Sequence, residues 1–302
     1  MSVIVQDLTK IYGRQKAVAG ISFTAEKGKV LGFLGPNGAG KSTTMKIITC
    51  FIPSSTGKVE VCGLDVAEQA MEVRRKIGYL PEHNPIYKDM YVKEFLQFLC
   101  RLHQLDRPRQ RIAEMIEITG LEKEQHKIIG TLSKGYRQRV GLAQAMIHDP
   151  EVLILDEPTT GLDPNQLQDI RSLIKNISHN KTVILSTHIM QEVQAVCDQV
   201  VILNEGRIVA DAPIEELISQ TSGKRTLSLE LQENIRPEAL LSIPGVSSLE
   251  AAGNHKWQLT ATEDVREQVF RMAVQQNWTL LALYQQHNTV ENVFQLLTKA
   301  NR

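Results

Sequence analysis

The chain has 302 residues, which is enough for one large domain or two smaller ones. Lys plus Arg and Asp plus Glu both number 34, so no bulk charge points to nucleic acid or to an acidic partner. The N-terminus lacks a basic leader with an apolar core, and no apolar run approaches the roughly 18 residues of a membrane span. We therefore expect a globular cytoplasmic protein. No zinc-site spacing relates its cysteines, which are Cys50, Cys62, Cys100 and Cys197.

The first 30 residues alternate apolar and polar side chains, as two or three strands would. The predicted strands lie near residues 3–5, 17–19 and 21–23. Between the first two, Tyr12 stands just before a glycine turn. Its ring either covers the sheet edge or provides a surface on which an adenine stacks, and the sequence leaves both readings open.

A phosphate-binding pattern follows directly. The apolar run 29–34 predicts a buried strand, and residues 42–50 predict a helix. The residues that join them fit G-x-x-x-x-G-K-[ST], and they are Gly35, Pro36, Asn37, Gly38, Ala39, Gly40, Lys41, Ser42 and Thr43. A strand, a glycine loop and a helix aim backbone N–H groups at an anion. We expect Lys41 to reach the terminal phosphates of a nucleotide and the Ser42 hydroxyl to bind Mg²⁺.

The middle of the chain is predominantly helical. A helix at 66–75 and a strand at 77–80 lead to Pro81 and Glu82. Three helices are then predicted, at 92–105, from Ile112 to Gly120, and at 137–148. The first of them is expected to place one apolar face against the core, formed by Phe95, Leu96, Leu99 and Leu102.

Two further strands end in chemically useful side chains. The apolar strand 151–156 ends at Asp156 and is followed by Glu157, and the strand 182–186 leads to His188. A strand-end Asp can hold Mg²⁺ near the phosphates, and the neighbouring Glu can orient or deprotonate a water. Alone, the two acids could simply cap a strand, but after a phosphate loop they indicate a nucleotide hydrolase. Guanine specificity is unsupported, because residues 180–183 carry Val where a guanine-binding Asp would stand.

The C-terminal part differs from the rest in composition and in its pattern of predicted elements. A polar stretch at 219–224 predicts a linker between a domain at 1–220 and a second at 225–302, with a helical subdomain at about 84–150 in the first. The second domain reads as strand, helix, two strands, helix, strand and helix, which resembles a ferredoxin-like α+β arrangement. The predicted segments are 226–231, 237–242, 247–251, 256–260, a helix capped by Thr262 and running to 276, 278–284 and 290–299.

Taken together, these motifs resemble the nucleotide-binding subunits of ATP-binding cassette (ABC) transporters over roughly residues 2–220. The matching positions occur in the family's order: Tyr12, the phosphate loop 35–43, Pro81-Glu82 at the Q-loop, residues 132–136 at the signature, 155–158, 161–164 at the D-loop and 186–188 at the switch. The resemblance implies an α/β P-loop NTPase cassette, with a parallel-sheet core, an antiparallel β subdomain and a helical subdomain. It also implies an ATPase.

The resemblance further implies a role for each matching residue. Glu157 would be the catalytic base, and His188 would contact the γ-phosphate and help to position it. Ser133 and Gly135 would close over the nucleotide of a second protomer, while Asp163 would lie across the interface. Two ATP molecules would thus be held between two copies of the chain or between the chain and a related subunit.

The implied cofactors are ATP and Mg²⁺. Lys41 would act on the phosphates, and Ser42, Asp156 and Glu82 would face the metal ion. Two positions depart from the family's pattern. Glu82 stands where most relatives have Gln, and Lys134 stands within an L-S-K-G-Y signature in place of L-S-G-G-Q. Lys134 is read as a solvated side chain, with an added cation near the γ-phosphate as the alternative.

Two functional classes fit this reading. As a transporter motor, the chain would lie on the inner face of the membrane and dock integral membrane permeases near residues 82–105. The stretches 77–82 and 289–294 resemble ATPases of ABC-2 type exporters, and 82–87 looks most like gliding-motility ATPases. The alternative is a soluble ABC ATPase acting on ribosomes or DNA. Such proteins usually carry two cassettes or a coiled-coil insertion, neither of which occurs here, so a nucleic-acid partner is not expected.

Overall fold

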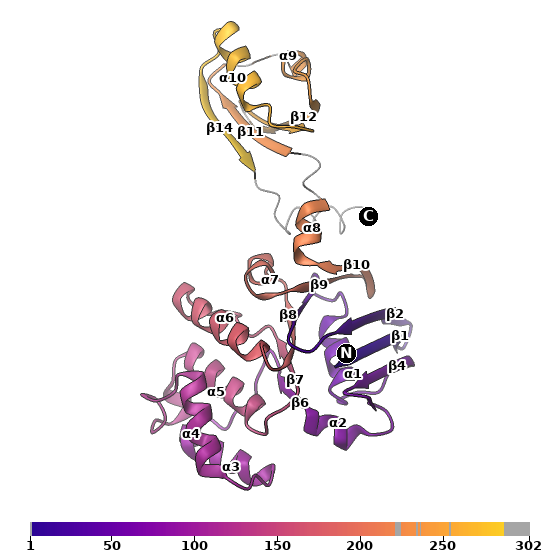
Figure 1. Cartoon of the computed structure of the whole chain (residues 1–302), viewed down its shortest axis with the longest axis vertical. Coiled ribbons are helices and arrows are strands. Elements are labelled where there is room, and N and C mark those ends of the chain that lie inside the picture. The colour runs from indigo at the N-terminus through magenta and orange to yellow at the C-terminus, as the bar shows by residue number, and fades with distance from the viewer. Residues whose placement is uncertain (1, 221–224, 234, 236, 254, 287–302) are drawn as a thin grey trace. The chain divides into compact units, whose positions relative to one another are not determined.

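The computed structural model describes residues 2–220, 225–233, 235, 237–253 and 255–286. The chain divides into two compact units, Met1–Pro213 and Ile214–Arg302 (Figure 1). The helix predicted at 290–299 and the stretch 289–294 lie outside the described residues, as do residues 221–224 of the predicted linker.

The first unit is built on a six-stranded sheet with the order β10-β9-β3-β8-β7-β6. Its strands are β3 (Val30–Leu34), β6 (Ile77–Leu80), β7 (Val152–Asp156), β8 (Thr182–Thr187), β9 (Gln199–Asn204) and β10 (Arg207–Pro213). All neighbours pair in parallel except β10, which returns antiparallel to β9. Strands β3, β7 and β8 are buried at every residue, as expected for parallel strands covered on both faces.

An antiparallel sheet with the order β2-β1-β4-β5 packs against this one. Its strands are β1 (Val3–Tyr12), β2 (Gln15–Ala25), β4 (Thr56–Val61) and β5 (Leu64–Asp65). One core cluster joins both sheets and helix α1 (Lys41–Ile48), and it includes the Phe23 and Phe33 rings, whose centroids are 5.0 Å apart. This shared core fixes the β1–β2 hairpin beside the loop that leads into α1.

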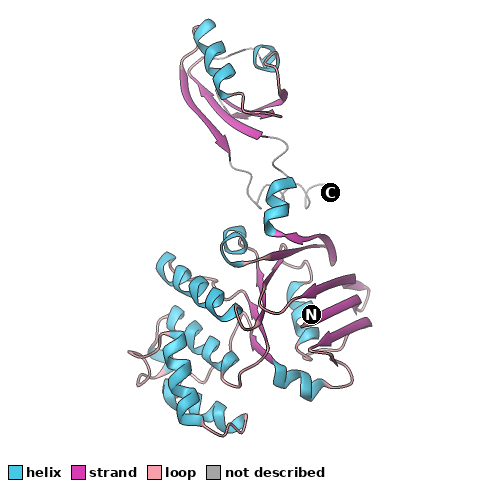
Figure 2. Cartoon of the chain, in the orientation of Figure 1, coloured by secondary structure: helices cyan, strands magenta, loops and turns pink. Residues whose placement is uncertain are grey.

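Helices α3 (Val92–Leu102), α4 (Pro108–Thr119) and α5 (Lys134–Met146) form a separate helical group (Figure 2). Phe95, Leu96 and Leu99 are buried as predicted, whereas Leu102 is 65% exposed. Helix α3 ends at Leu102, so this residue lies on the last turn and outside the packed face. The remaining helices of the first unit are α2 (Ala70–Lys76), α6 (Pro164–Ser178), α7 (Met190–Val196) and the 3₁₀ turn Ile129–Thr131.

The second unit opens with α8 (Ile214–Gln220) and contains a four-stranded antiparallel sheet with the order β12-β13-β11-β14. Its elements are β11 (Arg225–Leu231), α9 (Pro237–Leu241), β12 (Val246–Gly253), β13 (Lys256–Ala261), α10 (Arg266–Gln275) and β14 (Leu280–Gln286). The order β-α-β-β-α-β and this strand arrangement are those of a ferredoxin-like fold. The unit has its own apolar core, which includes Leu227, Leu229, Leu259 and Val269.

Several predicted boundaries differ from the structure. Thr262 does not cap α10, which begins at Arg266 after Val265; the Thr262 amide instead donates to the Gly245 carbonyl. Helix α2 begins at Ala70 rather than at residue 66, because Asp65 holds residues 67 and 68 in a turn. Helix α5 begins at Lys134 rather than at residue 137.

Candidate functional site

The carboxyl ends of four parallel strands meet at one edge of the central sheet. Leu34 at the end of β3 pairs with Thr187 at the end of β8, Ser186 pairs with Asp156, and Leu155 pairs with Leu80. Ligands of open α/β sheets bind at this edge, because the loops that follow the strands converge there. The loops here are those that carry the phosphate motif, Glu82, Glu157 and His188.

The loop 35–40 is shaped by its glycines. Gly40 has φ of +107°, and a Cβ there would lie 2.5 Å from the Ala17 carbonyl oxygen. No other residue type fits both the backbone conformation and this approach to β2. The chain then turns directly into α1, whose first backbone N–H groups have no intrahelical partners and no side-chain cap.

Lys41 folds back beneath this loop. Its side chain is only 6% exposed, and its ammonium donates to the carbonyl oxygens of Gly35 at 2.6 Å and of Pro36 at 3.3 Å. Burial lowers the pKa of Lys41, whereas the charges of Glu157, Asp156 and Glu82 act to raise it. These three carboxylates are therefore close enough to raise the pKa of the Lys41 ammonium. The sequence predicted that all four residues belong to one site.

Glu157 and His188 are in direct contact. The His188 Nδ1 lies 2.8 Å from the Glu157 Oε2, and the Thr160 hydroxyl donates to the same oxygen at 3.3 Å. Glu157 is 7% exposed and has φ of +53°, a left-handed conformation that is uncommon for a residue with a side chain. Its backbone N–H donates to the Ser186 carbonyl at 2.9 Å, so the carboxylate is held where strands β7 and β8 end.

Asp156 lies beside Glu157 at the end of β7 and is 3% exposed. Its Oδ1 is buried without a hydrogen-bond partner. A buried carboxylate oxygen without a donor is costly, so this atom is suited to a cation. Among the described residues, no group of three His, Cys, Asp or Glu side chains could hold a metal ion by itself. A cation here would need further ligands from water or from a bound phosphate.

These side chains border one cleft of about 370 Å³. The predicted residues that line it are Tyr12, Asn37, Gly38, Gly40, Lys41, Ser42, Thr43, Glu82, Glu157 and His188. Gly35, Ala39 and Asp156 are buried and do not line the cleft, and the exposed Pro36 does not line it either. Tyr12 is 49% exposed, with the Lys10 ammonium 5.3 Å from its ring centre, so one ring face is partly covered by a cation.

Two lining residues, Gln15 and Ala17, were not expected from the sequence. Gln15 pairs with Tyr12 across the β1–β2 hairpin, so it faces the same cleft. The glycine turn after Tyr12 is the signal from which this pairing could have been inferred.

Ser133, Gly135 and Asp163 do not line this cleft. Ser133 caps α5 through a hydrogen bond from the Tyr136 amide at 3.3 Å, and Asp163 caps α6 by accepting from the amides of Asn165 and Gln166. Gly135 lies inside the first turn of α5 rather than before it, and a Cβ there would collide with Gln166. Ser133 and Asp163 are exposed and belong to a second surface on the same protomer, and the buried Gly135 lies beneath it.

Lys134 lies next to that surface. It is exposed, and its ammonium lies directly over Gly161, where an added Cβ would clash with it. Its stem thus runs along the loop between Glu157 and α6, a contact that the sequence does not predict.

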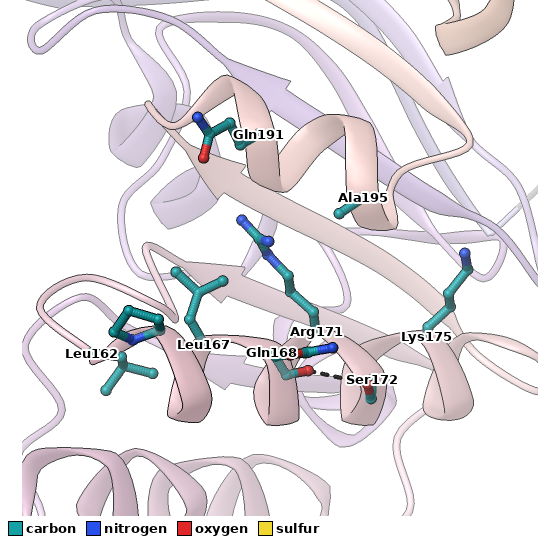
Figure 3. Close-up of a pocket in the computed structure, with 9 residues that line it drawn as sticks. Leu162, Leu167, Gln168, Arg171, Ser172, Lys175, Gln191 and Ala195 are labelled. Atoms are coloured by element: carbon teal, nitrogen blue, oxygen red, sulfur yellow. Dashed lines mark hydrogen bonds between the residues drawn. The ribbon is translucent and has the colours of Figure 1, made fainter.

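A second hollow, of about 540 Å³, lies between α6 and α7. Figure 3 shows Arg171 of α6 pointing toward α7, where Gln191 and Ala195 stand. The lining includes neither the phosphate loop nor Glu157 or His188, and most of its residues are exposed. We assign this hollow no part in nucleotide binding.

Comparison with known proteins gives consistent matches. Residues 18–160 match the family described as "ABC transporter". The chain is 35% identical over 245 residues to the bacitracin transport ATP-binding protein BcrA of Bacillus licheniformis, covering 80% of this chain and 79% of that protein. It is 31% identical over 302 residues to the linearmycin resistance ATP-binding protein LnrL of Bacillus subtilis (strain 168), covering 97% of both.

Among solved structures, one described as the ATP binding subunit of an ABC transporter superposes with a TM-score of 0.67 at 28% identity. The match covers 73% of this chain and 93% of that one. In the part of the chain that the structure describes, every helix is too short or too polar to span a membrane.

Proposed function

The chain belongs to the ABC transporter ATPases, and we propose that it hydrolyses ATP between two protomers to drive a separate membrane exporter. One observation carries the catalytic part of this proposal. Glu157 and His188 contact each other at 2.8 Å in the same cleft as Lys41 and the phosphate loop. A carboxylate that can activate water therefore faces the place where a terminal phosphate would lie.

The phosphate loop, Lys41, Glu157 and His188 each have a proposed role. The loop amides and the N-terminus of α1 bind the phosphates, and Lys41 neutralises their charge. Glu157 accepts the proton of the attacking water. His188 fixes the orientation of Glu157 through its Nδ1 contact and presents its half-exposed ring to the γ-phosphate.

The residues also fit a magnesium ion. Asp156 offers a buried oxygen without a partner, and the Ser42 hydroxyl and the Glu82 carboxylate line the adjoining cleft. A bound Mg²⁺ would offset the negative charge that gathers on the phosphates. Oxygen ligands of this kind, completed by phosphate and water, are those that Mg²⁺ prefers.

A second protomer completes the site in this proposal. Ser133 and Gly135 stand at the N-terminus of α5, an anion-favouring position, yet they lie outside the chain's own cleft. Two copies that face each other head to tail would bring this surface onto the partner's ATP, with Asp163 at the interface.

The membrane partner is proposed to dock on the helical segment near residues 82–105. Large apolar side chains in this segment are exposed, and they are Tyr87, Tyr91, Phe98 and Leu102. Exposed aromatic groups of this kind suit a protein–protein contact. Export is proposed because the relatives named above are described by bacitracin transport and linearmycin resistance. Those names give no support to gliding motility, which stays a prediction.

The chain would then work at the inner face of the membrane, bound to its permease. The alternative, an ATPase acting on ribosomes or DNA, is disfavoured because the chain carries equal numbers of basic and acidic residues. Affinity purification from the native membrane separates the two: an integral membrane protein should copurify in stoichiometric amount, whereas ribosomes or DNA in its place would refute the transport role.

The catalytic proposal is tested with Glu157→Gln. The amide keeps the size of the side chain but cannot take a proton, so steady-state phosphate release should fall by at least about a hundredfold. ATP binding should persist, and an ATP-bound dimer should accumulate in size-exclusion chromatography with light scattering. Hydrolysis at the wild-type rate would remove Glu157 from the role of base.

A further inference from the structure

Glu192 is a buried acid outside the cleft. It lies on α7, its residue is 0% exposed, and no basic side chain among the described residues pairs with it. A carboxylate in such a place is costly, and an apolar residue would fill the same space more favourably. The presence of an acid at this buried position therefore requires an explanation other than packing.

Both carboxylate oxygens accept hydrogen bonds from buried threonines. The Thr159 hydroxyl donates to Oε1, and the Thr187 hydroxyl donates to Oε2 at 2.8 Å. The Thr187 oxygen in turn accepts from the Ile189 amide at 3.1 Å. The two hydroxyls reach different oxygens of Glu192, so a carboxylate, which offers an acceptor at both positions, satisfies both in this geometry.

The two threonines belong to the two catalytic loops. Thr159 follows Glu157 by two residues in the loop after β7, and Thr187 is the last residue of β8 and directly precedes His188. On the side facing the cleft, Glu157 and His188 contact each other at 2.8 Å. Away from the cleft lining, the buried Glu192 joins the same two segments through Thr159 and Thr187. Two separate sets of contacts therefore hold the segments together.

We propose that Glu192 is a positioning residue for ATP hydrolysis, which holds the Glu157 and His188 loops in the register that their contact requires. This inference rests on the proposed catalytic function of these two residues. Glu192 touches no reacting atom and acts only through the loops. Its loss should therefore lower kcat and leave the affinity for ATP, which depends on the phosphate loop, nearly unchanged.

The first test is Glu192→Gln. The amide accepts at one atom only, so one threonine loses its acceptor. We expect kcat to fall about tenfold or more while KM and the Kd for ATP change less than about twofold. The matched control is Gln194→Ala, an exposed position on the same helix, which should keep the wild-type kcat.

A second pair of variants separates positioning from folding. Thr187→Ser keeps the hydroxyl and should retain most of the wild-type kcat, whereas the isosteric Thr187→Val should lose as much as Glu192→Gln. The thermal unfolding midpoint of each variant is also measured, and kcat is determined at a temperature well below that midpoint. If kcat followed the thermal midpoint rather than the presence of the hydroxyl, the role would be structural and the proposal would be wrong.

The decisive measurement is a double-mutant cycle with His188→Ala. A residue that acts through the Glu157–His188 contact should have little further effect once His188 is gone. An unchanged fall in kcat upon adding Glu192→Gln would overturn the positioning role. The proposed function fails separately, if the wild-type protein itself hydrolyses no ATP. Wild-type hydrolysis with an unimpaired Glu192→Gln would reject only the inference about Glu192.

Discussion

At the scale of single residues, the position of Lys41 suits it to bind an anion. Its ammonium is buried beneath the loop, where the Gly35 carbonyl accepts from it at 2.6 Å. Burial lowers its pKa, and the nearby carboxylates counteract this effect. A bound phosphate would offer stronger acceptors than two carbonyl oxygens, because hydrogen bonds between ionised groups are shorter and stronger.

Replacing Lys41 should therefore weaken nucleotide binding. In Lys41→Ala we expect a ten- to hundredfold increase in the Kd for MgATP, the value of roughly one lost charge-assisted bond. Titration calorimetry measures it. Lys46→Ala, an exposed lysine of the same helix, is the matched control and should bind ATP as the wild type does. An unchanged Kd in Lys41→Ala would contradict the phosphate-loop role.

The sequence predicted most of the residues that line the cleft, but it did not predict the residues that support them. The pattern G-x-x-x-x-G-K-[ST] fixes residue types at fixed spacing, and the strand-end acids are adjacent in sequence, so both can be read locally. Glu192, Thr159 and Thr187 are brought together only by the pairing of β7 with β8 and by the packing of α7. No spacing rule reports a contact of that kind.

At the scale of elements, the helical group is attached to the sheet through a histidine pair. His103, at the end of α3, stacks on His148, with ring centroids 4.3 Å apart and planes 5° from parallel. The His148 Nε2 lies 3.0 Å from the Ile77 carbonyl of β6, and its Nδ1 is buried without a partner. Burial, His103, Lys181 and Arg111 lower the pKa of His148 to about 4.

This arrangement predicts acid sensitivity. The unfolded chain takes up a proton at His148 below about pH 6.5, whereas the folded chain resists it until about pH 4, so stability falls as the pH decreases through that window. The largest loss that His148 can cause is about 3 kcal/mol, from a difference of roughly 2.5 pH units.

Urea unfolding at pH 7.5 and pH 4.5 tests this. His148→Gln should lose less stability on acidification than the wild type, because its side chain does not titrate. Asp149, which pairs with Lys181 and Arg111, also responds to acid, so only the difference between the two proteins is attributed to His148. His179→Gln, at an exposed position, should behave as the wild type. Equal losses in all three proteins would refute the prediction.

Strands and helices with a strong apolar pattern could be predicted from the sequence. A helix that is marked mainly by its capping residues was harder to predict. The buried strands β3, β7 and β8 follow from apolar runs, and Gly120 ends α4 in a left-handed conformation as expected. Helix α6 was not predicted, although Asp163 and Pro164 form its N-terminal cap. These residues were interpreted only as a D-loop, although an Asp followed by Pro is also typical of a helix N-terminus.

At the scale of the whole molecule, the two surfaces that are proposed to bind ATP lie apart on one protomer. The cleft holds the phosphate loop and Glu157, whereas Ser133 and Gly135 stand at the N-terminus of α5 outside it. A symmetric head-to-tail dimer would make two composite sites, each with one surface from each chain.

Mixing two inactive variants tests this arrangement. Lys41→Ala and Ser133→Arg are each expected to be inactive as homodimers, since each damages both sites. In a mixed dimer both lesions fall in one site, and the other site is intact. A one-to-one mixture should regain roughly a quarter of the wild-type phosphate release if protomers exchange freely and sites act independently. No recovery despite demonstrated exchange would exclude the composite site.

The division into a cassette and a ferredoxin-like unit was read from a change in texture near residue 220, and the alternation of the second unit's strands predicted its sheet. The sheet order of the second unit, β12-β13-β11-β14, follows once the element order is known, because few topologies satisfy the rules for such a motif.

The position of β3 also determines when this molecule can become active during its synthesis. Val30 pairs with Val183, and Leu31 pairs with Gln199, so both neighbours of β3 come from far along the chain. Contacts of such large sequence separation form slowly, because a long loop must close first. During synthesis, strand β3, which precedes the phosphate loop, therefore cannot pair with β8 and β9 until both have emerged from the ribosome. A nascent chain shorter than this has no complete catalytic edge, and its apolar β3 is a segment for chaperones to protect.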